Sequence, residues 1–379
     1  VGIDNVEIYS PFPNDVQVSS INRPISSCGL SAADTIEVTI KNIGTSPASN
    51  FGVSYSLNGA AAVNETVTAT ILPNDSLIYK FNTTGNFAAV GTYTIEAFTS
   101  LALDGNIAND SSAVTIENDP IFSPTYSEDF EGASTGWVAY GTNSSWQLGI
   151  PPAPLPYINT AASGQKAWVT NLTGNYNNFE QSYLESPCFD FSQSIGDPIV
   201  SFAIIYKSEQ TSLNNINDYL FMESSTDNGL TWSKVPAAPI ASNWYNNNVA
   251  GVWADNSNGW INVENVLLGL AGESQVKLRF ALVTDGFPTF EGFGIDKFSI
   301  RNPQNVDMGV NTLLYPSSTN SPICGYGSNE NIIIQIENKG ANPVNSYSVS
   351  YQVDNGTIYT ENVNAVLPPS SRLNYTFNN

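Results

Sequence analysis

The sequence predicts an all-β fold, and three observations lead to that prediction. Short runs in which apolar and polar residues alternate recur along the chain. Gly, Asn, Pro and Asp separate these runs, as expected for turns between strands. We find no convincing amphipathic helical pattern in the sequence. We therefore expect β-sandwich domains from one end of the chain to the other.

An internal repeat with a period of roughly three hundred residues sets the domain organisation. Residues 1–8 resemble residues 293–300, and residues 35–44 resemble residues 331–340. The repeat predicts the last strand of a preceding domain at 1–10, a small domain at 11–118, a larger domain at 119–302 and a second small domain at 303–379. We expect that second copy to be truncated and to lack its last two strands.

Residues 35–41 show the strand pattern most clearly. Ile36, Val38 and Ile40 are apolar and alternate with polar residues, which places one face of the strand against a core. Further strands are expected near residues 16–21, 51–57, 67–71, 76–81, 92–98 and 113–116. Seven short strands over about a hundred residues fit an immunoglobulin-like sandwich.

The amino-acid composition argues against several classes of partner and of function. With 12 basic and 34 acidic residues the formal net charge is −22, which argues against nucleic acid and anionic membranes as partners. The absence of histidine removes the commonest general base and transition-metal ligand. No stretch is long and apolar enough to insert into a bilayer. We expect a secreted or cell-surface protein that is not an enzyme.

The small domain resembles the CARDB type of bacterial cell-adhesion module. The resemblance rests on residues 38–45 (VTIKNIGT), 51–59 (FGVSYSLNG) and 91–95 (GTYTI), and it spans roughly residues 12–118. It includes an Asn-x-Gly turn at residues 42–44. An Ig-like β-sandwich is the fold that this resemblance implies.

The larger domain resembles the MAM-like jelly roll, with the cleaved-adhesin domains of gingipains and modules of type IX-secreted Bacteroidota surface proteins as close relatives. The resemblance is carried in order by residues 128–132 (EDFEG), 136–137, 146–149, 167–172, 184–187, 200–202 and 292–296. Members of this group are mostly binding or structural modules, so the resemblance also implies a domain without catalysis.

Acidic residues of the jelly roll are candidate metal ligands. Alternation places Asp296 on the same strand face as Phe298, and a half-buried carboxylate needs a partner. The resemblance implies a structural calcium ion between the first and last strands, with Asp129 and Glu131 on the first. Caps made by backbone amides, or plain solvation, are the alternative for these carboxylates.

Two further acids belong to the same prediction. Glu209 and Asp218 match a Glu…Asp-Tyr feature of the jelly-roll family, which implies that they are additional metal-ligand candidates. Hard oxygen ligands without histidine or thiolate suit Ca²⁺ and not zinc. A glycosidase with paired carboxylates is the catalytic alternative, but nothing else in the sequence supports a catalytic cleft.

Aromatic residues near Asn-rich stretches suggest a sugar platform. Trp244, Tyr245 and Trp253 are candidates for stacking on a glycan. Core packing is the preferred interpretation for most of these rings, and Tyr245 and Trp253 are the two expected to be exposed. Residues 225–232 (STDNGLTW) fit the Asp-box spacing. We interpret them as a β-hairpin with an Asn-Gly turn and a packed Trp, because a propeller repeat is absent.

Cysteines and hydroxyl groups complete the candidate residues. Cys28, its repeat partner Cys324, and Cys188 allow a disulfide between domains, and free buried thiols are the alternative. Thr35 and Ser76 follow Asp in the tripeptide on which this bacterial group attaches O-glycans, so the resemblance implies a glycoprotein.

We therefore interpret the chain as a segment of a large secreted or surface-anchored bacterial adhesin or filament. Alternating Ig-like and jelly-roll domains would extend the polypeptide and present surfaces to glycans or host surfaces, with neighbouring repeats of the same chain as partners. The alternative is a glycan-binding accessory region of a secreted hydrolase or peptidase. A full-length reading frame with many further units would favour the adhesin, whereas one catalytic domain would favour the accessory role.

Overall fold

A computed structural model describes residues 11–132, 135–152, 156–212, 215–316 and 330–378. The described part contains no helix and is 47% strand, so the predicted all-β fold is confirmed. The chain divides into two compact units, Val1–Ile121 and Phe122–Asn379. The predicted strand at residues 1–10 and Cys324 lie outside the described residues.

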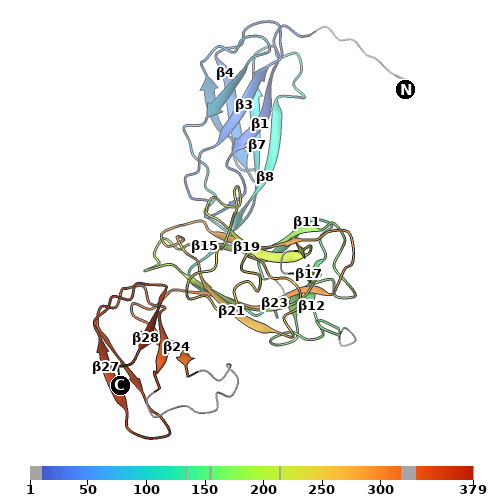
Figure 1. Cartoon of the computed structure of the whole chain (residues 1–379). Helices are drawn as coiled ribbons and strands as arrows, with labels where there is room; N and C mark the ends of the chain where they lie inside the picture. Colours follow the sequence, from blue (N-terminus) through green and yellow to red (C-terminus); the bar gives the residue numbers. More distant parts are fainter. Residues whose placement is uncertain (1–10, 133–134, 153–155, 213–214, 317–329, 379) are drawn as a thin grey trace. The chain divides into compact units, whose positions relative to one another are not determined.

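The first unit is a two-layered β-sandwich (Figure 1). One sheet has the order β1-β3-β6 and the other the order β2-β8-β7-β4-β5. The strands are β1 (Val16–Arg23), β2 (Ser27–Cys28), β3 (Glu37–Asn42), β4 (Phe51–Leu57), β5 (Val63–Val67), β6 (Ser76–Lys80), β7 (Gly91–Ser100) and β8 (Ser111–Asp119).

Alternation along β3 fills the core of this sandwich. Val38 and Ile40 are fully buried, and the residues between them are partly exposed. From the opposite sheet, Tyr55 packs edge-on against Phe81, with 4.8 Å between ring centroids. The side-chain period of two in a strand explains why this one-sided pattern was readable from the sequence.

The Asn-x-Gly turn after β3 has a specific hydrogen-bonding role. Asn42 is fully buried; its Nδ2 donates to the carbonyl oxygens of Ser46 (2.9 Å) and Ile71 (2.8 Å), and its Oδ1 accepts the N–H of Gly44 (3.0 Å). A Cβ on Gly44 would lie 2.7 Å from the carbonyl oxygen of Pro13. The turn therefore requires both the amide side chain and the glycine.

The same turn recurs at residues 338–340 with the same hydrogen bonds. Asn338 is also fully buried, and its Nδ2 donates to the carbonyl oxygens of Asn342 (2.9 Å) and Leu367 (3.0 Å). Its Oδ1 accepts the N–H of Gly340 at 2.9 Å. The same local sequence thus closes the same turn in both copies.

A group of acids near the loop that follows β7 makes the stability of the first unit depend on pH. Partial burial, and then the negative charges of Asp104 and Asp15, raise the pKa of Asp110 from 3.8 to about 6. Because the folded state holds this proton more tightly than the unfolded chain, the associated stability is complete below pH 3.8 and is lost as the pH rises through about 6.

We expect Asp110→Asn to raise the melting temperature of the first unit at pH 7.5, where the wild-type carboxylate is charged, and to leave it nearly unchanged at pH 3.5. Asn keeps an oxygen that can accept from Thr99, whose Oγ1 lies 3.5 Å from Asp110 Oδ1. Calorimetry of both proteins at the two pH values measures the effect. An equal difference at both pH values would contradict it.

The second unit begins with a jelly roll made of two larger sheets. One has the order β12-β13-β23-β16-β21, with β10 also paired to β23, and the other has the order β11-β14-β22-β19-β20. Their strands are β10 (Thr125–Glu128), β11 (Val138–Thr142), β12 (Trp146–Gly149), β13 (Ala167–Thr170), β14 (Gln181–Glu185), β16 (Ile199–Lys207), β19 (Tyr219–Ser225), β20 (Ser233–Lys234), β21 (Ile261–Val266), β22 (Lys277–Val283) and β23 (Gly292–Arg301). Shorter strands are β9 (Ile121–Phe122), β15 (Cys188–Phe189), β17 (Gln210–Ser212) and β18 (Asn215–Ile216).

Aromatic rings fill the space between the two jelly-roll sheets. Phe280 of β22 is fully buried and lies 4.9 Å from the ring of Phe202 and 6.2 Å from that of Trp137, measured between centroids. Phe298 of β23 adds a ring 4.7 Å from Trp137. Aromatic packing of this kind supplies much of the burial in a sandwich core.

The remaining strands form a smaller sandwich within the second unit. One sheet has the order β24-β25-β28 and the other pairs β26 with β27. The strands are β24 (Met308–Tyr315), β25 (Ile333–Asn338), β26 (Tyr347–Tyr351), β27 (Tyr359–Val363) and β28 (Ser371–Thr376). In the first unit β4 pairs with both β5 and β7, whereas its counterpart β26 pairs only with β27 among the described strands.

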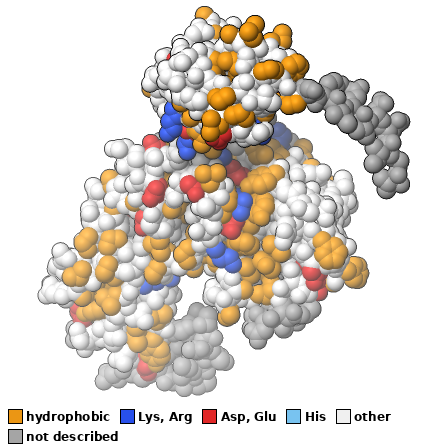
Figure 2. Space-filling view, turned by 90° about the horizontal axis from the view of Figure 1, so that it is seen from above, with side chains coloured by type: hydrophobic (Ala, Val, Ile, Leu, Met, Phe, Trp, Pro, Cys, Tyr) orange, Lys and Arg blue, Asp and Glu red, His pale blue; other side chains and the backbone are white. Residues whose placement is uncertain are grey.

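The surface carries few charges. On the face seen in Figure 2, acidic and basic side chains occupy a small part of the surface beside hydrophobic and other groups, in keeping with the 12% of charged residues in the sequence. Within the described residues there is no helix of the length and apolarity needed to cross a membrane.

Candidate functional site

The outward side of the sheet β11-β14-β22-β19-β20 is rich in aromatic and charged residues. Alternation decides which residues it displays: Leu220 and Met222 of β19 point into the core, and Tyr219, Phe221 and Glu223 lie partly exposed on the other side. We call this side the outer face. Its members are Tyr140, Tyr183, Glu185, Tyr219, Phe221, Glu223, Trp232, Lys234, Lys277 and Arg279.

Arg279 lies at the centre of the outer face. Its guanidinium carbon is 3.8 Å from the ring centroid of Tyr183 and 4.0 Å from that of Trp232, so the planar group is held against two rings. Its Nε donates to Glu223 at 2.7 Å and its Nη1 to the hydroxyl of Tyr140 at 3.1 Å. Stacking and charge-assisted hydrogen bonds together fix this side chain in one position.

Strand register brings these groups together from distant parts of the sequence. Glu185 of β14 and Glu223 of β19 both stand opposite Arg279 of β22. Glu185 accepts from the hydroxyl of Tyr140 at 2.7 Å and from Lys277 at 2.9 Å. Burial, and then the bond to Glu185, raise the pKa of Tyr140 to about 12. The hydroxyl is therefore a proton donor at neutral pH.

The Asp-box sequence forms the hairpin that we predicted. β19 and β20 pair antiparallel, and Asn228 and Gly229 both have positive φ. Asp227 accepts from the hydroxyl of Thr231 at 2.6 Å and from the N–H of Thr231 at 2.8 Å, and these hydrogen bonds lower the pKa of Asp227 to about 2. The hairpin also positions Trp232, whose indole N–H donates to the carbonyl of Gly229 at 3.0 Å.

One end of the outer face borders a shallow cavity of about 280 Å³. Tyr219, Lys234 and Val252 are among its lining residues. The ammonium group of Lys234 lies 4.4 Å from the ring centroid of Phe221, and burial lowers the pKa of this lysine. A ligand on the outer face can therefore extend into a recess that offers a ring edge and a cation.

The predicted sugar platform of Trp244, Tyr245 and Trp253 is wrong. Their exposed fractions are 4%, 6% and 0%, and their rings pack on one another with centroids 4.6 to 5.3 Å apart. The indole N–H of Trp253 donates inward to the carbonyl of Asn243 at 3.1 Å. Core packing, the interpretation preferred for most of these rings, is what the structure shows.

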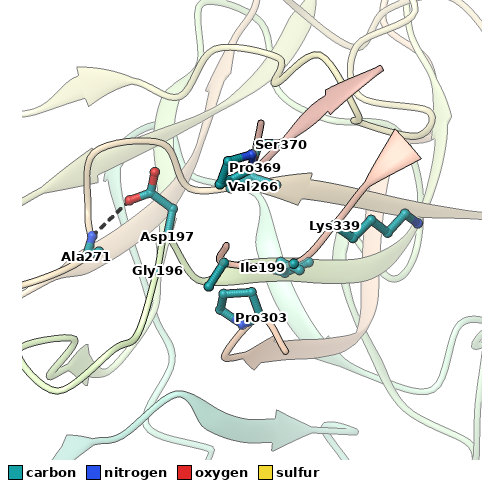
Figure 3. A pocket seen from close by; sticks show the side chains of 11 residues that line it. Gly196, Asp197, Ile199, Val266, Ala271, Pro303, Lys339, Pro369 and Ser370 are labelled. Carbon is teal, nitrogen blue, oxygen red and sulfur yellow. Dashed lines mark hydrogen bonds between the residues drawn. The ribbon is translucent and has the colours of Figure 1, made fainter. Parts of the chain in front are cut away.

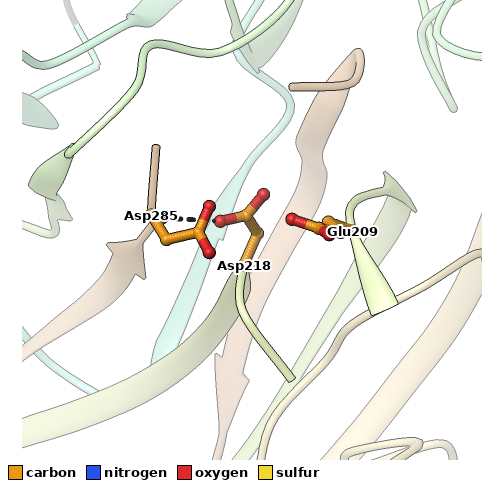
Figure 4. A group of neighbouring side chains, drawn as sticks. All are labelled: Glu209, Asp218 and Asp285. Atoms are coloured by element: carbon orange, nitrogen blue, oxygen red, sulfur yellow. Dashed lines mark hydrogen bonds between the residues drawn. The ribbon is translucent and has the colours of Figure 1, made fainter. Parts of the chain in front are cut away.

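Three carboxylates meet at one edge of the outer-face sheet. Glu209 follows β16, Asp218 directly precedes β19 and Asp285 follows β22. Because Tyr219 stands opposite Val283 in the ladder, Asp218 and Asp285 come to the same edge. One oxygen of each acid lies within 4.8 Å of the others, and the three side chains point toward one another (Figure 4). Among the described residues this is the acidic group that could hold a metal ion.

Neighbouring groups hold Asp218 in place. The Tyr176 hydroxyl donates to one of its oxygens, and the N–H of Asp285 donates to the other at 2.8 Å. Burial raises the pKa of Asp218, and the negative charges of Asp285 and Glu209 act in the same direction. Sequence reasoning found Glu209 and Asp218 but missed Asp285.

The other predicted metal ligands accept hydrogen bonds from backbone amides. Glu131 Oε1 accepts the N–H groups of Gln165 and Lys166, both at 2.7 Å, and Asp296 accepts the N–H of Ser163 at 2.7 Å. Asp129 accepts the N–H of Glu131 at 3.2 Å. Glu131 and Asp296 thus anchor the loop at 163–166. A shared ion at this place stays a prediction.

The remaining candidates are placed as follows. Cys28 and Cys188 are buried and disulfide-bonded. Thr35 and Ser76 are both exposed, so their glycosylation stays a prediction that the surface permits.

A further cavity of about 250 Å³ lies in the second unit (Figure 3). Asp197 on its wall accepts the N–H of Ala271 at 3.1 Å, and Lys339 is engaged by Glu264 at 2.9 Å. Since these charged groups already have partners, the cavity offers little to a ligand. The other lining residues are Gly196, Ile199, Val266, Pro303, Gly340, Ala341, Pro369 and Ser370.

Part of the sequence is similar to a known protein. Bacillopeptidase F of Bacillus subtilis strain 168 is 30% identical over 190 residues, which make up 50% of this chain and 11% of that protein. The chain thus spans about a tenth of the length of this relative. No protein-family model matches the chain.

Several solved structures are similar to parts of the chain. The CARDB domain of PF1109 from Pyrococcus furiosus is 23% identical and covers 29% of this chain and 97% of its own, with a TM-score of 0.23. The K3 cleaved-adhesin domain of Lys-gingipain from Porphyromonas gingivalis is 13% identical and covers 47% of this chain and 98% of its own, with a TM-score of 0.27. A xylan-binding domain of Xyn10C from Paenibacillus barcinonensis is 16% identical and covers 47% of this chain and 92% of its own, with a TM-score of 0.28. Similarities at these TM-scores assign no function.

Proposed function

We propose that this chain is a non-catalytic, extracellular adhesion segment whose jelly roll binds glycans through the outer face. The observation that carries the proposal is the fixed guanidinium of Arg279 between Tyr183 and Trp232, with further rings and charged groups beside it. Aromatic rings that can contact a sugar ring, together with positioned donors and acceptors for its hydroxyls, are the features that support this proposal.

The hydrogen bonds around Arg279 explain how a ligand would bind specifically without a large rearrangement of the protein. Glu223 and Tyr140 hold Arg279 before any ligand arrives, so few side chains lose rotational freedom on binding. The exposed edges of Tyr140 and Trp232 offer C–H contacts, and the oxygens of Glu185 and Glu223 can accept hydrogen bonds from sugar hydroxyls. Placement on paired strands keeps these groups in register.

Affinity electrophoresis against soluble xylan, mannan and β-glucan, followed by calorimetry with the polysaccharide retained best, tests the proposal. We expect Trp232→Ala to weaken binding at least about tenfold, the equivalent of about 1.4 kcal/mol, because it removes one stacking ring and frees Arg279.

Tyr157→Ala is the matched control, since Tyr157 is a partly exposed ring of the same domain that lies outside the outer face. Loss of binding in Trp232→Ala and its retention in Tyr157→Ala supports the proposal. Equal affinities of both variants and the wild type would contradict it, as would the absence of retention on a glycan array.

The alternative role is a glycan-binding accessory region of a secreted hydrolase or peptidase. The likeness to part of Bacillopeptidase F favours this alternative, because a similar segment occurs there within a much longer protein. Determination of the full-length reading frame separates the roles. Many further units of this kind support an adhesin or filament, including one exported by type IX secretion, whereas a single catalytic domain supports the accessory role.

An extracellular or cell-surface location is part of the proposal. The disulfide-bonded Cys28 and Cys188 support it, because disulfides persist mainly in oxidising compartments. Calcium is the cofactor that we propose for the jelly roll. The candidate ligands are all carboxylates, and hard oxygen donors of this kind suit Ca²⁺, which is abundant outside cells.

A further inference from the structure

We propose that Glu209, Asp218 and Asp285 form a divalent-cation site at the edge of the jelly roll, and that calcium binds here. The inference rests on the calcium part of the proposed function and adds the location of the ion and a third ligand. It is independent of glycan binding by the outer face. Three steps lead to it: an unpaired oxygen, an uncompensated charge and a fixed arrangement of ligands.

The unpaired oxygen belongs to Glu209. This side chain is only 8% exposed, and its Oε2 is buried and has no hydrogen-bond partner. Figure 4 shows that the carboxylate points toward Asp218. A buried carboxylate oxygen without a partner costs free energy, so it is normally satisfied by a donor or a cation. Here the direction of the side chain leads to two further carboxylates.

The charge of the group needs a cation. Among the ion pairs formed by the described residues, none involves Glu209, Asp218 or Asp285. Lys207 comes closest in the sequence, but its ammonium group lies 3.9 Å from Asp255 and over the ring of Phe290. Several negative charges in a buried place without a counter-ion are strongly unfavourable, whereas a divalent cation between them is not.

The ligands are positioned by the fold. The hydroxyl of Tyr176 and the N–H of Asp285 each donate to Asp218, and Asp285 Oδ1 accepts the N–H of Phe287 at 3.2 Å. The N–H of Glu209 donates to the same Tyr176 hydroxyl at 3.3 Å. Such outer contacts orient carboxylates around a metal ion. The all-oxygen ligand set suits calcium and, with a smaller radius, magnesium.

A proton shared between Glu209 and Asp218 is the competing explanation, because it would also relieve the repulsion. The two explanations differ in their response to metal. A bound ion stabilises the folded protein in proportion to its concentration, whereas a shared proton makes stability depend on pH and leaves it insensitive to calcium.

Tyrosine-sensitised terbium luminescence and scanning calorimetry on the whole chain test the site. Terbium reports on this place because Tyr176 contacts Asp218 directly. We expect luminescence that calcium displaces, and an increase of at least about 5 °C in the melting temperature of the second unit at one hundred times the Kd of calcium. Magnesium in a parallel titration shows which of the two ions the site prefers.

Variants locate the site. Glu209→Gln and Asp285→Asn should each lower the affinity for calcium at least about tenfold, because each removes a charged ligand. With EDTA present, Glu209→Gln should melt no lower than the wild type, since it also removes repulsion. Asp129→Asn is the matched control, and it should bind calcium like the wild type.

The outcomes separate this inference from the broader proposal. Calcium binding that survives Glu209→Gln and Asp285→Asn but fails in Asp129→Asn would overturn the location and keep calcium in the jelly roll. A wild-type chain that binds neither calcium nor terbium would overturn both. A lower melting temperature of Glu209→Gln in EDTA, with calcium affinity unchanged, would show a structural role only and overturn the site.

Discussion

Phe280→Ala will destabilise the second unit by about 3–5 kcal/mol, the largest effect that we expect from a single change in the jelly roll. Phe280 is fully buried between the two sheets, and its ring lies within 6.5 Å of the rings of Phe202, Trp137, Trp253 and Phe298, measured between centroids. Its removal takes away the transfer free energy of one ring and leaves a cavity that strands fixed by their ladders cannot close.

Urea unfolding followed by tryptophan fluorescence measures this loss, because Trp137 and Trp253 lie beside the cavity. Phe287→Ala is the control: its ring is 83% exposed, and we expect a change below about 0.5 kcal/mol. A loss below about 1 kcal/mol in Phe280→Ala would mean that the core tolerates the cavity or that the ring is not central to it.

Asn42→Ala will destabilise the first unit by about 3 kcal/mol. The buried amide of Asn42 satisfies the carbonyl oxygens of Ser46 and Ile71 and the N–H of Gly44, and alanine leaves all three without that partner. A buried group without a hydrogen bond costs about 1–3 kcal/mol, and partial access of water to the turn reduces the sum.

Calorimetry that separates the transitions of the two units is the measurement. Asn64→Ala, at an exposed position of the same sandwich, is the control and should change little. Asn338→Ala should produce the corresponding loss in the second unit, since Asn338 makes the same three contacts. If Asn42→Ala melts with the wild type, the turn is not held by its side chain.

Local periodicity explains what could be predicted from the sequence. The alternation around Val38 and Ile40 and the Asn-x-Gly turn depend on neighbours in the chain, so both predictions were sound. The hairpin at residues 225–232 was predictable for the same reason. Each of these features shows itself in a sequence pattern only a few residues long, although Asn42 also bonds to the distant Ile71.

The candidate sites were harder because they depend on which strands pair. Asp285 joins Asp218 only because β22 lies beside β19 in the sheet, and no local pattern states that pairing. The ring of Trp253 was expected outside because Asn residues surround it, but Leu220 exchanges backbone hydrogen bonds with it and draws it inward. The alternation of Tyr219, Phe221 and Glu223 with apolar residues could have indicated the outer face.

Because β26 pairs with only one strand, β27, among the described residues, the polypeptide is expected to self-associate. One long edge of the strand presents its backbone N–H and C=O groups without a neighbouring strand among the described residues. Such an edge accepts any extended segment, including the same edge of another molecule. The apparent mass of the polypeptide in solution should therefore increase with concentration. Glycan and metal affinities are best measured in dilute solution, where the polypeptide is monomeric.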